Sequence, residues 1–230
     1  MITLESPVPT ALARTLDPAV PSNALALGAT AAGALAGLVW GAGRGGPLRA
    51  VRTSVGWGGG AFAAWAIARE LDPDHPSTAA LAIPLTAAGL ALGTPSPPVT
   101  LTTLLAARTA AGTVGVALRR TDVAVLALLG GGALASLSRR GRVGRPLDAP
   151  SAGVALTAAL ATATTLPARA VRSRTDVGGR PIQAARIGTA RILAAATIGL
   201  CALAGRPGVA ANTPAVAALV ATAVARLSRR

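Results

Sequence analysis

The chain has 230 residues, of which 52% are apolar and only 13% charged, and its mean hydropathy is +0.56. A soluble domain of this length carries more charge, so the composition indicates a membrane protein. All 22 basic residues are arginines, tyrosine is absent, and the chain has one cysteine and one histidine. This inventory excludes a catalytic lysine, an internal disulfide and a metal site built from several histidines.

The net charge of +14 and the isoelectric point near 12.0 make nucleic acid a partner to consider. Nucleic-acid binding combines clustered cations with aromatic side chains that stack on bases. Here aromatic residues make up 2% of the chain, and the arginines fall between apolar runs. Such a pattern is typical of loops that flank membrane helices. We therefore expect membrane lipids, anionic ones above all, as partners, and no nucleic acid.

In chain order, residues 1–23 form a short proline-containing tail without the pattern of a cleavable signal peptide. The first apolar run, 24–43, has 20 residues and no charge, enough for about 30 Å of helix. Further apolar runs lie at 53–68, 77–94, 99–118, 123–138, 151–166, 187–205 and 209–225. A soluble core of this size would need more polar sequence to cover it. The expected fold is therefore all-α: residues 24–230 form a single transmembrane domain, a polytopic membrane helix bundle of seven to eight transmembrane helices.

Small residues are spaced four apart in the first apolar run, at Gly33, Gly37 and Gly41. Helices in lipid associate by close backbone approach at such small-residue faces. We expect this ladder to meet another helix, and it is a candidate interface for a homo-oligomer. Similar spacings at 56–60 and 89–93 are ascribed to the abundance of glycine and alanine.

The connections between runs are short. Trp40 and Trp57 flank the arginine-containing loop 44–52, where they are expected to anchor the chain at one membrane interface. The connections 95–98 and 119–122 are so brief that the helices on either side should form antiparallel hairpins.

The distribution of arginines predicts the topology, because cytoplasmic loops carry an excess of positive charge. Eight spans with both termini inside give only a small excess of arginine in the cytoplasm. Seven spans, with run 151–166 not crossing and the N-terminus outside, obey the rule better. In both versions the loop 167–191, which holds six arginines, and the C-terminus are cytoplasmic. The predicted location is the cell membrane, with a multi-pass topology.

A polar stretch between the second and third runs holds Glu70, Asp72, Asp74 and the single histidine, His75. Carboxylate oxygens are the ligands that Mg²⁺ and Ca²⁺ prefer, so these residues are a candidate site for a divalent cation. Their spacing matches no established metal motif. The alternative is structural: neighbouring prolines make a rigid turn, Asp72 or Asp74 caps the next helix, and Arg69 pairs with an acid.

Arg108 is the tenth of the twenty residues in the run 99–118. An arginine at the centre of a membrane helix costs roughly 2.5 to 3.5 kcal/mol on insertion scales. It therefore needs a partner: a loop acid such as Glu70, a threonine or carbonyl, a water-filled cavity, or an anionic ligand. Alternatively, the helix is displaced and the guanidinium reaches an interface. Arg186 and Arg191, near the start of the run 187–205, are placed to bind lipid phosphates.

The residues favour one function and leave two others open. No Walker loop, prenyltransferase-type aspartate cluster or protease dyad is present. The leading hypothesis is a small-solute transporter or binding protein, for an anion held by Arg108. The second is a membrane-embedded lipid-processing enzyme that uses the 70–75 turn as a metal site, and the third is a non-catalytic membrane subunit. A transporter predicts a polar cavity at Arg108, whereas an enzyme predicts that the acids converge on one point.

Overall fold

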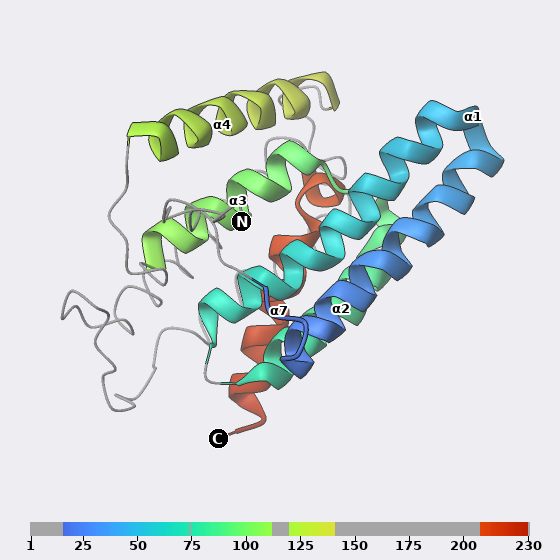
Figure 1. The fold of residues 1–230 in the computed structure, drawn as a ribbon. Helices are drawn as coiled ribbons and strands as arrows, with labels where there is room; N and C mark the ends of the chain where they lie inside the picture. Colours follow the sequence, from blue (N-terminus) through green and yellow to red (C-terminus); the bar gives the residue numbers. More distant parts are fainter. Residues whose placement is uncertain (1–15, 74, 112–119, 141–207, 230) are drawn as a thin grey trace, which may run out of the picture.

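The computed structural model describes residues 16–73, 75–111, 120–140 and 208–229, and every regular element in these ranges is a helix (Figure 1). The elements are α1 (Pro21–Leu71), α2 (Pro76–Gly89), the 3-10 helix η1 (Leu90–Leu92), α3 (Pro97–Ala111), α4 (Arg120–Arg140) and α7 (Thr213–Leu227). The prediction of an all-α fold is confirmed. The apolar runs 151–166 and 187–205 lie outside the described residues.

Helix α1 is a hairpin of two antiparallel arms, formed by the first two apolar runs. The arms are separated at Gly45 and Gly46, whose backbone is not helical. Gly46 has φ of +78°, a conformation that glycine adopts at little cost. Pro47 follows at once and suits the first turn of the second arm. The predicted loop 44–52 is thus wrong in extent, since a two-glycine turn suffices and the rest is helical.

The two arms meet along the glycine ladder of the first apolar run. A Cβ at Gly37 would lie 2.6 Å from the carbonyl oxygen of Thr53, and one at Gly41 would lie 2.6 Å from Cα of Ala50. No side chain fits between backbones this close. The prediction that the ladder of Gly33, Gly37 and Gly41 meets another helix is confirmed. The contact is made within one chain, and a homo-oligomer through the same residues stays a prediction.

The other small-residue spacings are also packing contacts, contrary to expectation. A Cβ at Gly56 would lie 3.0 Å from the carbonyl oxygen of Pro95, and one at Gly60 would lie 3.1 Å from the Pro95 ring. Gly89 of α2 lies directly against the side chain of Thr213 in α7. Glycine therefore sets the distance between neighbouring segments at several places in the bundle.

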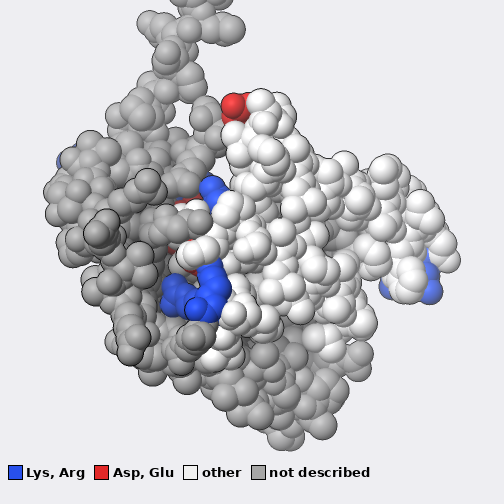
Figure 2. All heavy atoms as spheres, turned by 90° about the horizontal axis from the view of Figure 1, so that it is seen from below, with Lys and Arg blue, Asp and Glu red and all other residues white. Residues whose placement is uncertain are grey.

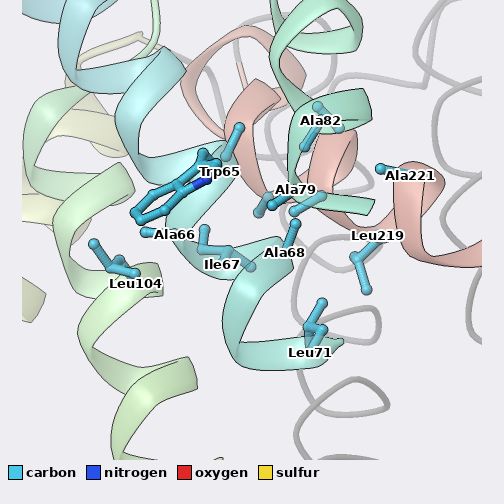
Figure 3. Packing of buried hydrophobic residues seen from close by; sticks show 14 of the residues in the cluster. Trp65, Ala66, Ile67, Ala68, Leu71, Ala79, Ala82, Leu104, Leu219 and Ala221 are labelled. Atoms are coloured by element: carbon cyan, nitrogen blue, oxygen red, sulfur yellow. The ribbon is translucent and has the colours of Figure 1, made fainter. Parts of the chain in front are cut away.

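The core lies where the second arm of α1 meets α2, α3 and α7 (Figure 3). It is built largely of alanines, with a few larger side chains from α1, α3 and α7: Trp65, Ile67, Leu71, Leu104 and Leu219. Small side chains let the helix axes approach closely, so the bundle is held by contact between backbones more than by large apolar side chains.

The connection between α2 and α3 does not produce the expected hairpin. Helix α2 packs against α1 and α7, whereas α3 packs against α1 and α4. The backbone N–H of Ser96 donates to the carbonyl of Ala211 at 3.2 Å, which ties this connection to the start of α7. The loop therefore leads the chain across the bundle, because α7 occupies the position beside α2.

The bundle has two distinct ends, seen at the two extremes of α1 in Figure 1. The tip end contains the Gly45–Gly46 turn, the connection 93–96 and the start of α7. The turn end contains the connection 72–75, the start of α1 and the end of α7. The first and last described helices therefore begin and finish at the same end.

The hairpin of α1 projects beyond the other helices at the tip end (Figure 1). Its projecting part exposes large apolar side chains, among them Val39 at 75% and Leu48 at 83%. Among the described residues, α1 is the one helix long and apolar enough to cross a membrane, and only 17% of its most apolar 18-residue stretch is buried. The count of seven to eight spans goes beyond this observation.

Candidate functional site

Charged side chains collect at the turn end, drawn from α1, α3, the end of α7 and the connection 72–75. Figure 2 views the molecule from below, toward this end: blue and red atoms gather beside one another, and most of the described surface around them is uncharged. We call these residues the turn-end cluster: Glu70, Asp72, His75, Arg108, Arg226 and Arg229.

The most deeply buried contact of the cluster joins Arg108 of α3 to Glu70 of α1. Arg108 Nε donates to Glu70 Oε1 at 3.0 Å, and the two residues are 9% and 1% exposed. Glu70 Oε2 is buried and has no hydrogen-bond partner in the described part of the chain. Of the partners proposed for Arg108, the structure therefore shows the acid Glu70, in contact with Nε of the guanidinium.

Arg108 lies level with the last turn of α1. The connection before α3 packs beside Gly60, in the middle of the second arm of α1. Helix α3 therefore runs alongside the C-terminal half of that arm, and Arg108 reaches Glu70. Its central place in an apolar run does not give it a central depth in the bundle, because α1 and α3 are offset along their axes.

Asp72, two residues after Glu70, is bound by donors from three parts of the chain. It accepts hydrogen bonds from Thr78 Oγ1 at 2.6 Å and from Arg229 Nη2 at 2.5 Å, and His75 Nδ1 lies 2.9 Å from its other oxygen. Burial by itself raises the pKa of Asp72, but the bonds from Thr78, Arg229 and His75 and the charge of Arg229 lower it more. Its pKa therefore lies below the usual value, and the carboxylate stays ionised.

The end of α7 is fixed to the end of α1 by a second arginine. Arg226 Nη2 donates to the carbonyl oxygen of Leu71 at 3.3 Å, while its Nη1 atom is buried without an acceptor among the described residues. Arg229 in turn donates from Nε to the carbonyl of Ala225 at 2.7 Å, which orients its other nitrogens toward Asp72.

The structural alternative for residues 70–75 was a turn in which an aspartate caps the next helix and Arg69 pairs with an acid. The turn is present, but the described contacts differ. Helix α2 begins at Pro76 after His75, and among the described residues no side chain caps its first N–H groups. The expected cap from Asp72 is wrong, because this carboxylate binds the hydroxyl of Thr78 instead. Arg69 donates to the carbonyl oxygen of Pro73 at 3.2 Å and not to an acid.

The residues predicted to hold a divalent cation do not converge in the part of the chain that is described. Glu70 and Asp72 are bound to different arginines, and no three acidic, histidine or cysteine residues of the described ranges come together. Asp74 lies outside the described residues. The divalent-cation site therefore stays a prediction. Arg186 and Arg191, the predicted lipid-phosphate ligands, also lie outside the described residues.

A second site at the tip end was missed by the sequence analysis. An open pocket of about 510 Å³ is lined by Arg49 and Arg52 of α1, by Thr53, and by Thr94 from the connection after η1. One signal was present in the sequence: the two arginines are three residues apart on a helix, and no acid occurs between Pro18 and Arg69. Assigning 44–52 to a loop hid their shared face.

Comparison with known proteins gives no further guide, since no protein-family model, characterised protein or solved structure matches the chain.

Proposed function

We propose that the chain is a multi-pass membrane protein that binds a small anion at Arg108 and carries it across the bilayer. The observation that supports this most is the buried contact between Arg108 Nε and Glu70 Oε1, which leaves Glu70 Oε2 without a donor among the described residues. An arginine can bind a carboxylate or phosphate through two parallel hydrogen bonds. Within the described part of the chain, the carboxylate of Glu70 is bonded at only one of its two oxygens.

Exchange of Glu70 for a soluble anion follows from this incomplete pairing. A buried oxygen without a donor costs about 1 to 3 kcal/mol. Glu70 is thus easier to displace from its arginine than a fully bonded carboxylate, and an anion that enters beside Arg108 replaces the lost negative charge. Arg226, whose Nη1 is buried without an acceptor in the described part of the chain, supplies a second cation at the same end.

Two features of α1 support a membrane location. A core helix of a soluble protein is mostly buried, whereas the most apolar stretch of α1 is only 17% buried. The projecting hairpin exposes several large apolar side chains, and a group of this kind marks a contact with lipid or with another protein.

The arrangement of the ends supports an even number of crossings. Because α1 begins and α7 finishes at the turn end, the chain enters and leaves the bundle on the same side (Figure 1). Eight spans with both termini in the cytoplasm fit this arrangement, and seven spans do not. Under this proposal the hairpin tip faces the outside, although the count of arginines alone favours seven spans.

The two other hypotheses have less support. A lipid-processing enzyme needs acids that share a metal, and here Glu70 and Asp72 are engaged by separate arginines. A non-catalytic subunit needs a free packing face, and the glycine ladder of α1 is covered by the second arm of the same helix.

Anion binding is tested first on purified protein in detergent. Thermal unfolding is followed while sodium chloride or sodium acetate is varied at constant ionic strength. We expect at least one of these anions to raise the unfolding midpoint of the wild type, and Arg108→Met to lose that response. Arg120→Met, at an exposed position of α4, is the matched control and should keep it. Equal responses in Arg108→Met and the wild type, or no response to any anion, would show that Arg108 is not the site.

Transport is tested with the same variants in proteoliposomes, by measuring uptake of the anion that raises the midpoint. Wild type and Arg120→Met should accumulate it, and Arg108→Met should fall to the level of protein-free vesicles. Binding without uptake in the wild type would retain the anion site and remove the transport function.

A further inference from the structure

The pocket at the tip end offers a second anion site, independent of Arg108. Arg52 lies about 27 Å from Glu70 along the second arm, counting 1.5 Å for each of the residues between them. The pocket and the turn-end cluster therefore occupy opposite ends of the bundle.

One arginine of the pocket, Arg49, is held in place by a backbone carbonyl and not by an acid. Arg49 Nη1 donates to the carbonyl oxygen of Arg44 at 2.8 Å across the hairpin turn. This bond fixes the Arg49 guanidinium and leaves its other N–H groups available to an acceptor. Arg44 stacks over the ring of Trp40, 3.4 Å from its centroid. Arg52, three residues after Arg49, points to the same face of the helix.

Helix α1 offers these cations no acid before Glu70, because the sequence from 19 to 69 contains neither aspartate nor glutamate. Turn-end arginines such as Arg108 and Arg229 contact carboxylates, whereas Arg49 and Arg52 have no such partner among the described residues. Like charges this close repel one another, and an anion between them removes that repulsion.

The size of the pocket suits a molecule that carries a phosphate group. The volume of about 510 Å³ falls within the range of about 300 to 1,000 Å³ usual for small-molecule sites, and the Thr53 hydroxyl in its wall donates to the carbonyl oxygen of Arg49 at 2.8 Å. Arginine binds phosphate oxygens through its planar fork. Beside the pocket, Leu48 is 83% exposed and Val51 is 55% exposed, so the cations border an apolar surface.

We propose that Arg49 and Arg52 bind a phosphate group in this pocket, either a free phosphate or the phosphate of an anionic lipid headgroup. The same tip carries exposed apolar side chains and the tilted pair of Trp40 and Trp57, whose ring centroids are 5.8 Å apart. Cations beside apolar and tryptophan side chains are typical of a bilayer interface. A free phosphate and a lipid headgroup present the same phosphate oxygens to the arginines. They are distinguished by whether inorganic phosphate or a phospholipid must be added to delipidated protein.

The test measures the unfolding midpoint of delipidated protein in detergent with added inorganic phosphate, with phosphatidylglycerol, or with oleate, an anionic amphiphile without phosphorus. A rise with inorganic phosphate alone identifies a free phosphate as a ligand. A rise with phosphatidylglycerol, and not with oleate or inorganic phosphate, identifies the lipid headgroup. No rise with either phosphate-bearing probe, or an equal rise with oleate, would overturn the proposal.

Variants at the tip separate the pocket from general attraction to charge. Arg52→Gln should weaken the apparent affinity for the effective probe about tenfold, since a charge-assisted hydrogen bond is lost. Arg44→Gln removes the same charge from the same tip outside the pocket lining and should change the affinity less than threefold. Equal losses in the two variants would mean that the tip attracts anions without a defined site. Arg108→Met should leave the response to the probe unchanged, which distinguishes this site from that of the proposed transport function.

Discussion

The two ends of this bundle hold their helices together by different means. At the tip end, the arms of α1 are joined by backbone contact at Gly37 and Gly41, and the arginines there have no acid beside them. At the turn end, Glu70 of α1 contacts Arg108 of α3, and Asp72, just after α1, contacts Arg229, just after α7. Arg108 and Arg229 at the turn end thus contact carboxylates, whereas Arg49 and Arg52 at the tip have no carboxylate partner in the described part of the chain.

The turn end itself contains a second contrast, between two acids in neighbouring positions. Asp72 receives donors on both of its oxygens, from Thr78, Arg229 and His75. Glu70 is more deeply buried and has a described donor on only one oxygen. A carboxylate with complete bonding is a fixed structural group, and one with incomplete bonding can exchange its partner. The predictions below test these contrasts.

The largest effect is expected for Glu70→Ala. Removing one member of a buried ion pair takes the carboxylate away from the buried Arg108 guanidinium, and such a change costs about 3 to 5 kcal/mol of the free energy of unfolding. Denaturant unfolding in detergent measures this loss. Glu70→Ala combined with Arg108→Met should recover much of it, because no buried charge remains. A double variant no more stable than the single one would mean that Glu70 acts on stability by some route other than Arg108.

A smaller loss, with a defined pH dependence, is expected for Asp72→Asn. Hydrogen bonds to a charged group contribute about 1.5 to 3 kcal/mol. Because the pKa of Asp72 is lowered in the folded state, its contribution is present above the ordinary value of 3.8 and is lost as the pH falls through the lower, folded value. Wild-type stability measured from pH 6 to pH 2.5 should therefore decline more steeply than that of Asp72→Asn. Parallel curves would show that Asp72 is not held as an ionised group.

At the tip end, Gly37→Ala should destabilise the hairpin by about 1 to 3 kcal/mol, because its Cβ would overlap the backbone at Thr53. Gly43→Ala is the matched control in the same arm. Its Cβ would have no atom within 4 Å, so alanine should stabilise the helix by up to about 1 kcal/mol. Chemical unfolding of both variants gives the comparison. Equal stability of the two would exclude close contact between the arms.

The smallest effect is expected from metal chelation. If Glu70 and Asp72 serve different arginines, adding EDTA or Mg²⁺ should leave the unfolding midpoint of the wild type unchanged. A midpoint that rises with Mg²⁺ in the wild type, and not in Asp72→Asn, would favour the enzyme hypothesis over the anion site.

Much of the helical architecture was predictable from apolar runs, since each run within the described residues is helical. The partner of Arg108 was also among those expected, because Glu70 is one of few acids in the chain. Side-chain composition could not predict that two glycines and Pro47 suffice to reverse the chain. Tertiary packing decided this, and with it the position of Arg49 and Arg52 on a helix.

The pairing of helices was less predictable than their existence. A short connection favours a hairpin only when the neighbouring position is free, and beside α2 it is occupied by α7. The offset of α3 against α1 likewise depends on contacts at Pro95 and Gly60, which no local pattern specifies. For this reason a central position in the sequence of a run did not give Arg108 a central depth.

The side of the membrane on which each end lies is open to direct labelling. In a Cys201→Ser background, cysteines at Val20 and Leu227 mark the turn end and a cysteine at Leu48 marks the tip, all at exposed positions. An even number of crossings predicts that an impermeant maleimide labels the first two from the same side and Leu48→Cys from the opposite side. Labelling of Val20→Cys and Leu227→Cys from opposite sides would restore the seven-span topology.

The central claim, that Glu70 is the exchangeable partner of Arg108, is tested most directly by anion affinity in two acid variants. The anion that stabilises the wild type is titrated into Glu70→Gln and Asp72→Asn, and its apparent dissociation constant is taken from the unfolding midpoints. Because the Gln side chain no longer competes as an anion, Glu70→Gln should bind the anion about tenfold more tightly, whereas Asp72→Asn should bind it as the wild type does. Unchanged affinity in Glu70→Gln, or the same gain in Asp72→Asn, would contradict the claim.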